Sequence, residues 1–375
     1  MDPVTQDPQK QATASPWSFR IATIEGIPIR LHFTFLLFLA YIGFVGQDRG
    51  GLIWPLFVIA VFACVLLHEL GHALAAKKYG VHTRDITLYP IGGVAMLEGR
   101  PNARQELVIA LAGPLVNVVI AVALAVGLVL RHGTIPLDPQ LRTDTFLSTL
   151  FLANVTLAVF NLIPAFPMDG GRVLRSILAL RMPEVRATQI AAFVGQALAI
   201  LLFVYALFHE GQVILALVAF FVFLGAGQEL AGSVTRSLLA GHKAADAMQS
   251  RFRTIESGAS MSHAAEMLLA GSQADFPVVV GDEIVGTLSR THIARGLSEG
   301  GPDAYVAEFM QRGIKTTDPQ VPLESIAESV VDKEDPSPVL VMEEGRLIGI
   351  ITQENLSEFI MLENAKRSSG RTAAA

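Results

Sequence analysis

Long apolar stretches separated by short polar segments dominate the first two thirds of the chain. A membrane-crossing helix needs about 20 mostly apolar residues. The pattern predicts six such spans, over residues 30–47, 52–77, 105–130, 146–164, 188–208 and 211–229. The fourth span leads into IPAFPMDGG, where Pro164, Pro167 and the following glycine pair break the helix. Irregular backbone at membrane depth is tolerated only inside protein or beside a water-filled cavity, so this break indicates a site.

From about residue 244 the pattern changes to strand-like runs that alternate with amphipathic helical stretches. The segment from AADAM to RTHI parallels the later segment from VAEFM to QENL, which aligns Met248 with Met310 and Gly286 with Gly349. Such an internal repeat indicates two copies of one fold packed together. We therefore expect the following division: a disordered tail over 1–16, a membrane domain over 17–240, repeats over 244–300 and 303–364, and a disordered tail over 365–375.

Positive charges predict how the spans are oriented. One side would hold Lys10, Arg20, Arg30, Lys77, Lys78, Arg84, Arg100, Arg104, Arg172, Arg175, Arg181, Arg186, Arg236 and Lys243, and the other only Arg49, Arg131 and Arg142. Because positive loops stay in the cytosol, we expect both termini and the repeats to be cytosolic in a multi-pass protein of the plasma membrane.

The composition agrees with this organisation. The chain is 51% apolar and 17% charged, with a mean hydropathy of +0.48, whereas soluble domains carry about 25% charged residues. A net charge of −6 without a basic stripe argues against a nucleic-acid partner. Cys64, the single cysteine, excludes an internal disulfide and a thiolate zinc cage. The expected fold is a polytopic α-helical membrane protein of about six transmembrane helices, with a small membrane-associated β-segment and a C-terminal α/β pair.

The second predicted span contains LLHELGHALAA, which places ionisable groups in an apolar helix. His68 and His72, at i and i+4, share one helical face and can present both imidazoles to one metal ion. Glu69 lies off that face, where it can take a proton from an attacking water. Zinc binds histidine nitrogen readily, and a catalytic site keeps one position open, so the motif predicts a catalytic zinc ion.

The helix break offers a third ligand. Asp169 follows the prolines of NLIPAFPMDGG, and a loop closed by prolines and glycines can turn a short carboxylate inward. A buried carboxylate without a partner is otherwise costly, which favours a metal-binding role. Asp169 could also cap the helix that begins near Gly170, and the two roles are compatible.

Other polar residues at membrane depth have structural explanations. We expect His32 and His82 to be packed or hydrogen-bonded rather than bound to metal. Asn117 and Asn154 are expected to hydrogen-bond between helices.

The paired motifs HELGH and NLIPAFPMDGG resemble those of the site-2 protease family, the intramembrane zinc metalloproteases. The likeness covers about residues 17–235 and includes IEGIPIRLHFTFLL, LYPIGGVAML and AGPLVN. The stretch between the two motifs is too short for the PDZ domain that some relatives carry.

The resemblance assigns roles to particular residues. It implies one Zn²⁺ per chain, held by His68, His72 and Asp169, with Glu69 as the general base. Asn161 would lie near the metal and steady the substrate carbonyl. The implied partners are the lipid bilayer and a membrane-protein substrate, such as a single-span regulator or a pro-protein.

Residues 84–98, RDITLYPIGGVAMLE, have strand composition interrupted by Gly92 and Gly93. In the family, such a segment forms a sheet edge that pairs with an unwound substrate. Strand addition exposes a peptide bond that a helix would shield. The alternative is a simple re-entrant loop.

The tandem repeat resembles a CBS pair, which occurs in another branch of the family. Such pairs often bind adenine nucleotides. A ribose-binding copy ends in a glycine, then Ser or Thr three residues later, then Asp a further three residues later. Here GTLSRTHI has His292 and GIITQENL has Asn355 in the acidic position. The resemblance implies an adenine nucleotide at Thr352 and Asn355. The alternative is a structural pair that forms a homodimer.

Two other classes of function compete with proteolysis. In a regulated transporter, His68, His72 and Asp169 would line a metal path, but a transporter needs no general base such as Glu69. A catalytically inactive binding protein would not need the complete ligand set. The sequence therefore favours an intramembrane zinc metalloendopeptidase, modulated by its CBS pair.

Overall fold

The computed structural model describes residues 17–45, 51–90, 92–99, 101–135, 145–331 and 337–372. The chain divides into two compact units, Met1–Ala231 and Gly232–Ala375, which we call the membrane unit and the repeat unit. The tail expected at 1–16 lies outside the described residues.

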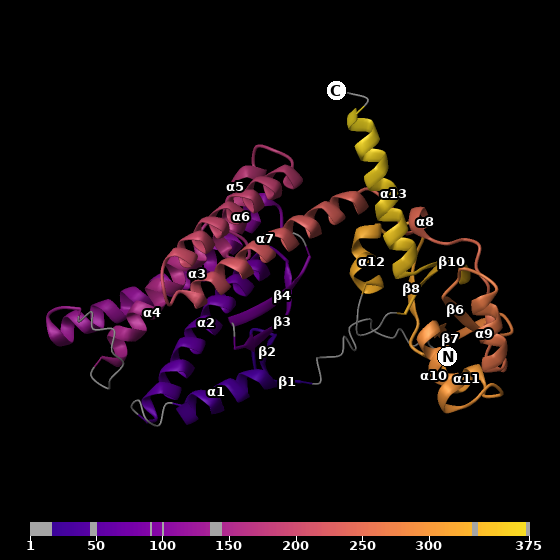
Figure 1. Cartoon of the computed structure of the whole chain (residues 1–375), viewed down its shortest axis with the longest axis horizontal. Coiled ribbons are helices and arrows are strands. Elements are labelled where there is room, and N and C mark those ends of the chain that lie inside the picture. The colour runs from indigo at the N-terminus through magenta and orange to yellow at the C-terminus, as the bar shows by residue number, and fades with distance from the viewer. Residues whose placement is uncertain are drawn as a thin grey trace. The chain divides into compact units, whose positions relative to one another are not determined.

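Apolar helices make up most of the membrane unit (Figure 1). They are α1 (Phe33–Val45), α2 (Ile53–Lys78), α3 (Ala103–His132), α4 (Phe146–Asn161), α5 (Asp169–Ala179), α6 (Glu184–Phe208) and α7 (Val213–Leu239), the last of which extends into the repeat unit. Within the described residues, α2, α3, α6 and α7 are long and apolar enough to cross a membrane, whereas α1 and α4 are apolar but shorter. Large apolar side chains such as Leu130 and Phe208, each 83% exposed, form a surface suited to lipid.

Helix α3 is the central element, because it packs against α2, α4 and α5. Its start is defined by a capping box: the Asn102 side chain accepts from the backbone N–H of Gln105, whose side chain accepts from the N–H of Asn102. Its end is marked by Gly133 in the left-handed conformation. These signals set where α3 begins and ends.

A four-stranded sheet, in the order β1-β2-β3-β4, completes the membrane unit. Its strands are β1 (Ser18–Ile24), β2 (Ile27–His32), β3 (His82–Tyr89) and β4 (Gly92–Glu98). Strands β2 and β3 are parallel and the other pairs antiparallel. Both β3 and β4 pack on α2 (Figure 1). Ile27 of β2 and Ile86 of β3 bury their side chains against Leu70 and Ala73 of α2.

The sheet is larger than the sequence analysis expected. Residues 84–98 were expected to form a β-segment, but β1 and β2 were not predicted. The first predicted span also started too early, because residues 30–32 belong to β2 rather than to a helix. Likewise α4 ends at Asn161, and the three residues that follow form a turn.

Two similar three-stranded sheets form the repeat unit, in the orders β5-β6-β7 and β10-β9-β8. Its elements are α8 (Ala244–Ala247), β5 (Ile255–Glu256), α9 (Met261–Leu269), β6 (Asp275–Val280), β7 (Glu283–Ser289), α10 (Arg290–Glu299), α11 (Val306–Phe309), β8 (Lys315–Thr317), α12 (Leu323–Val330), β9 (Val339–Glu343), β10 (Arg346–Ile351) and α13 (Gln353–Thr372). The helix α13 continues to Thr372, into the region expected to be a disordered tail.

The two copies exchange their first helices. Ala244 and Ala247 of α8 belong to the apolar core of the second copy, and Val306 of α11 belongs to the core of the first. The glycines of the repeat make matching contacts, because Gly349 lies against Met248 and Gly286 against Met310. The methionine of each copy thus contacts the glycine of the other copy.

Candidate metal centre

The side chains of His68, His72 and Asp169 meet at one buried point. Nε2 of His68 lies 3.1 Å from Nε2 of His72, and each of these nitrogens lies 3.1 Å from Oδ2 of Asp169. The three residues are buried, and together they form a group able to hold a metal ion. The structure therefore brings together the three residues that the sequence analysis nominated.

Local geometry explains why Asp169 reaches the histidines. Glycine is required behind it, because a Cβ at Gly170 would lie 2.2 Å from the carbonyl oxygen of Ile163, and one at Gly171 would lie 2.6 Å from the backbone nitrogen of Phe166. The alternative that Asp169 caps this helix is wrong, because Met168 holds the N-cap position in extended backbone. Asp169 is the first helical residue, and its carboxylate is directed at the histidines.

The donor set fits zinc. Bonds of about 2.0–2.2 Å in a tetrahedral arrangement separate ligand atoms by roughly 3.3–3.6 Å, close to the 3.1 Å separations observed. Nδ1 of His72 donates to the carbonyl oxygen of Ile109 at 2.7 Å, so its Nε2 carries a lone pair. Nδ1 of His68 lies 2.5 Å from Oδ1 of Asn117. A cation suits the converging lone pairs and carboxylate better than any neutral group does.

Helix α3 forms one wall of this centre at Gly113. A Cβ there would lie 2.3 Å from Nε2 of His72 and 2.7 Å from Nε2 of His68. On α2, a Cβ at Gly71 would lie 2.9 Å from the carbonyl oxygen of Ala112, so the two helices cross closely. Gly113 lies in AGPLVN, a segment that carried only a family resemblance in the sequence, and no role was expected for it.

Glu69 lies beneath strand β4. A Cβ at Gly93 would lie 2.6 Å from Cγ and 3.4 Å from Oε1 of Glu69, so the strand backbone crosses directly over this half-buried carboxylate. Gly92 precedes it with φ of +141°, a backbone conformation that favours glycine. Asn161 is the last residue of α4, and the described structure gives it no hydrogen bond to His68 or Asp169.

A buried ion cluster, which the sequence analysis missed, holds α5 in place. Arg175 of α5 pairs with Glu106 of α3 and with Glu229 of α7, and its guanidinium lies 5.4 Å from the ring centre of Phe166. Because α5 begins with Asp169, this cluster fixes the helix that carries the carboxylate. Charged residues at the ends of two predicted spans were the available signal.

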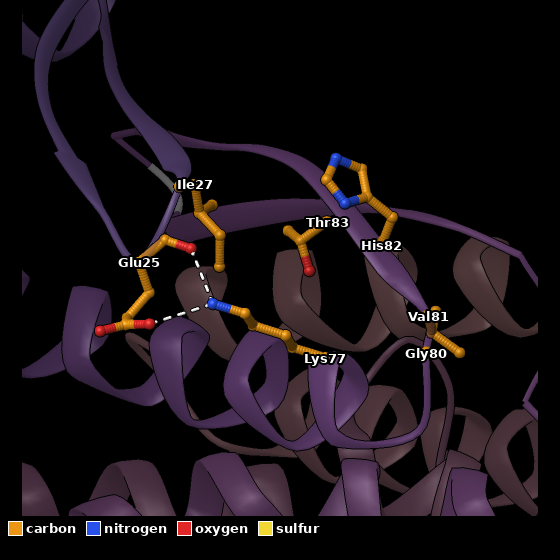
Figure 2. Close-up of a pocket in the computed structure, with 8 residues that line it drawn as sticks. Glu25, Ile27, Lys77, Gly80, Val81, His82 and Thr83 are labelled. Atoms are coloured by element: carbon orange, nitrogen blue, oxygen red, sulfur yellow. Dashed lines mark hydrogen bonds and ion pairs between the residues drawn. The ribbon is translucent and has the colours of Figure 1, made fainter.

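A separate pocket of about 180 Å³ lies where the β1–β2 turn meets the end of α2. There the Lys77 ammonium donates to the backbone carbonyl oxygen and the carboxylate of Glu25, each at 3.0 Å (Figure 2). His82 lines this pocket, and His32 hydrogen-bonds Thr34 at 2.8 Å. For His32 the expectation of a hydrogen-bonded histidine is confirmed.

In the repeat unit, Thr352 and Asn355, the two residues expected to bind a nucleotide, form a cap at the start of helix α13. Oγ1 of Thr352 donates to Oδ1 of Asn355 at 2.8 Å, and the N–H of Asn355 donates back to that hydroxyl. Ser289 and His292 form the equivalent cap in the first copy. Thr352 and Asn355 therefore lie together, but they are already hydrogen-bonded to each other.

Between these caps lies a charged cluster. Arg290 and Glu354 form an ion pair at 2.9 Å that links the two copies. Burial raises the pKa of Asp275 to about 6, with a further contribution from nearby Glu354 that Arg290 opposes. The pair thus has a titratable junction between its copies.

Comparison with known proteins agrees with both units. Peptidase family M50 matches residues 56–138 and 137–202, and the CBS domain matches residues 244–299 and 306–362. The chain is 35% identical over 340 residues to the zinc metalloprotease MJ0392 of Methanocaldococcus jannaschii, which covers 91% of this chain and 95% of that protein. It is 30% identical over 135 residues to the stage IV sporulation protein FB of Bacillus subtilis, covering 35% and 43% of the two chains.

Among solved structures, the site-2 protease from Methanocaldococcus jannaschii is 43% identical, with a TM-score of 0.44, and covers 57% of this chain and 95% of that chain. The match to the zinc metalloprotease MJ0392 along nearly the whole length of both chains is sufficient to show the family. The apolar helices agree with a multi-pass membrane protein. The chain therefore belongs to peptidase family M50, a family of zinc metalloproteases, and carries a C-terminal CBS pair.

Proposed function

We propose that this protein hydrolyses a peptide bond within or next to the membrane, with His68, His72 and Asp169 holding one Zn²⁺ and Glu69 acting as general base. The observation that carries this proposal is the meeting of three ligand atoms beside a half-buried glutamate. Zinc, when bound there, polarises the scissile carbonyl and makes water a better nucleophile. Glu69 takes a proton from the attacking water and returns it to the leaving amine.

Strand β4 is the proposed docking edge for substrate. It is an edge strand among the described strands of its sheet, and its residue Gly93 lies directly on Glu69. An extended segment that adds to this edge would place a peptide bond beside the carboxylate. The small size of Gly92 and Gly93 lets the substrate backbone come close, and Asn161 would steady the scissile carbonyl.

The proposed topology has six membrane segments, which include the shorter helices α1 and α4. The charge bias of the loops supports cytosolic termini in the plasma membrane. The sheet would then lie at the cytosolic membrane surface. The substrate would be a single-span regulator or a pro-protein.

The CBS pair is the proposed regulatory part. An adenine nucleotide would bind near Thr352 and Asn355, and the pair could also join two chains as a homodimer. Because Asn355 replaces the usual acidic residue, ribose recognition there would rely on an amide oxygen already bonded to Thr352. If nucleotide binds, its effect on cleavage should correspond to a coupling of about 1–3 kcal/mol.

The test compares purified wild type with Glu69→Gln for zinc content and for cleavage of a single-span substrate. We expect zinc to be retained and cleavage to fall at least ~10²-fold, because the amide cannot accept the water proton. Cleavage near the wild-type rate would overturn the role of Glu69. Zinc movement across vesicles that is unchanged in Glu69→Gln would support a transporter instead.

The ligand set has matched controls within the chain. His68→Ala, His72→Ala and Asp169→Ala should each lower zinc occupancy, whereas His32→Ala and His82→Ala should not. Full zinc stoichiometry in Asp169→Ala would show that the third ligand lies elsewhere.

A further inference from the structure

A buried chain of side-chain amides leads away from His68. Oδ1 of Asn117 lies 2.5 Å from Nδ1 of His68, and Nδ2 of Asn117 donates to Oδ1 of Asn154 at 3.0 Å. Nδ2 of Asn154 in turn donates to the carbonyl oxygen of Leu150 at 2.9 Å. Both asparagines are fully buried, at 0% exposure, in the apolar helices α3 and α4. Amides at such positions need a reason, because burying them is costly.

The chain has one favourable direction. The carbonyl oxygen of Leu150 can only accept, so the amide nitrogen of Asn154 faces it and Oδ1 faces Asn117. Asn117 must then donate through Nδ2, which leaves its own Oδ1 toward His68. The reversed arrangement would set Oδ1 of Asn154 against the oxygen of Leu150 at 2.9 Å.

This direction selects the tautomer of His68. An amide oxygen accepts only, so Nδ1 of His68 carries the proton and Nε2 keeps its lone pair. That lone pair is directed at His72 and Asp169. His72 reaches the same state more simply, since its Nδ1 donates to the backbone oxygen of Ile109. The two histidines are thus oriented by different parts of α3.

We propose that Asn117 and Asn154 are positioning residues for the metal centre. Asn117 holds His68 with Nε2 toward the ion, and Asn154 acts through Asn117 by fixing which way its amide points. The inference rests on the zinc site proposed above. Partners that orient a metal-binding histidine typically change metal affinity about 10–100-fold when they are removed.

The test measures zinc affinity by competition with a chelator and the visible absorption of the Co²⁺-substituted protein. Neither readout depends on cleavage. Asn117→Leu should weaken zinc binding roughly 10–100-fold and change the Co²⁺ spectrum. Asn117→Asp should lose less affinity than Asn117→Leu, because a carboxylate still accepts from Nδ1 of His68, although it cannot donate to Oδ1 of Asn154. Asn154→Leu should fall between these variants.

Ser148→Ala is the matched control, because Ser148 is a fully buried polar residue on α4 whose hydroxyl donates to the carbonyl oxygen of Thr145 at 2.8 Å, within its own turn. It should bind zinc as wild type does. Wild-type affinity and spectrum in Asn117→Leu would overturn the proposal. Equal losses in Asn117→Asp and Asn117→Leu would also overturn it, since they would indicate a packing defect. Absence of zinc in the wild type would instead overturn the metal site itself, and this role with it.

Discussion

The membrane unit and the repeat unit place their polar side chains in different ways. In the membrane unit, the 3.1 Å contact between Nε2 of His68 and Oδ2 of Asp169 joins residues 101 positions apart. In the repeat unit, Thr352 bonds Asn355 only three positions away. The first arrangement depends on how α2, α3 and α5 pack, whereas the second needs only one helix turn. Substitutions that disturb helix packing should therefore affect the membrane unit's chemistry most.

The largest expected effect follows from closing the wall of the metal centre. Gly113→Ala adds a methyl group where a Cβ would lie 2.3 Å from Nε2 of His72, so the histidines cannot converge. We expect zinc affinity to fall at least ~100-fold, the upper end of losses from outer residues. Gly127→Ala, on the same helix with open space around it, is the control. Full zinc occupancy in Gly113→Ala would show that the helices separate easily.

Removing the buried arginine should have the next largest effect. Arg175→Met leaves Glu106 and Glu229 without their shared partner, and breaking a buried pair typically costs about 3–5 kcal/mol. The matched control is Arg172→Met on the same helix. Arg172 is 3.8 Å from Glu106 and more exposed, so its loss should cost about 0–1 kcal/mol. Thermal unfolding in detergent would compare the stabilities of the two variants. Equal losses of stability would contradict the role of the buried ion cluster around Arg175.

The repeat unit offers a paired test of its exchanged contacts. A Cβ at Gly286 would lie 2.5 Å from the backbone oxygen of Gln311, whereas one at Gly349 would lie 2.5 Å from the side-chain sulfur of Met248. A methionine side chain can move aside, whereas the backbone of Gln311 is held by its hydrogen bonds to the backbone of Thr287. Gly286→Ala should therefore cost about 1–3 kcal/mol and Gly349→Ala less. Hydrogen exchange of the repeat unit in the full-length protein would measure both, and the reverse order would disprove this explanation.

The smallest expected effect is a pH dependence at the junction of the copies. The pKa of Asp275 is raised to about 6 in the folded protein, mainly by burial. Between about pH 4 and pH 6 the folded state therefore binds more protons than the unfolded state, so this residue's contribution to stability falls as pH rises. Asp275→Asn removes the contribution, and it should gain stability relative to wild type over that range.

Unfolding of the repeat unit at several pH values provides the measurement. Glu354→Gln should narrow the pH range over which Asp275 affects stability, because the charge of Glu354 helps to raise the pKa of Asp275. A constant difference between Asp275→Asn and wild type across the range would contradict the expectation.

The sequence predicted well which three side chains meet at the candidate metal centre, and it predicted the packing around them poorly. The i, i+4 histidines and the aspartate at a helix break are local signals, and the structure brings these side chains together. Asn117 and Asn154 were expected to hydrogen-bond between helices, and the bond that joins them across α3 and α4 confirms this. The contact of Asn117 with His68 was not, because it spans 49 positions and depends on the crossing of α2 and α3.

The missed strands have a similar cause. The apolar residues of β2 run directly into α1, so hydropathy alone merged them into one span. The Glu25-Gly26 dipeptide was the available signal for a hairpin, and both residues adopt positive φ in the turn. In the repeats, alignment identified equivalent positions such as Met248 and Met310. It could not show that each contacts the other copy, because equivalence and contact are different relations.

The exchange of α8 and α11 has a consequence for synthesis on the ribosome. The core that contains Ala244 also needs Leu356, and the core of the first copy needs Val306 from the start of the second. At about 5–20 residues per second, roughly ten seconds separate the emergence of Ala244 from that of Leu356. The core of the first copy cannot close before Val306 has emerged, and the core that contains Ala244 cannot close before Leu356 has emerged. The core that contains Ala244 is therefore exposed to chaperones and proteases until the start of α13 has emerged.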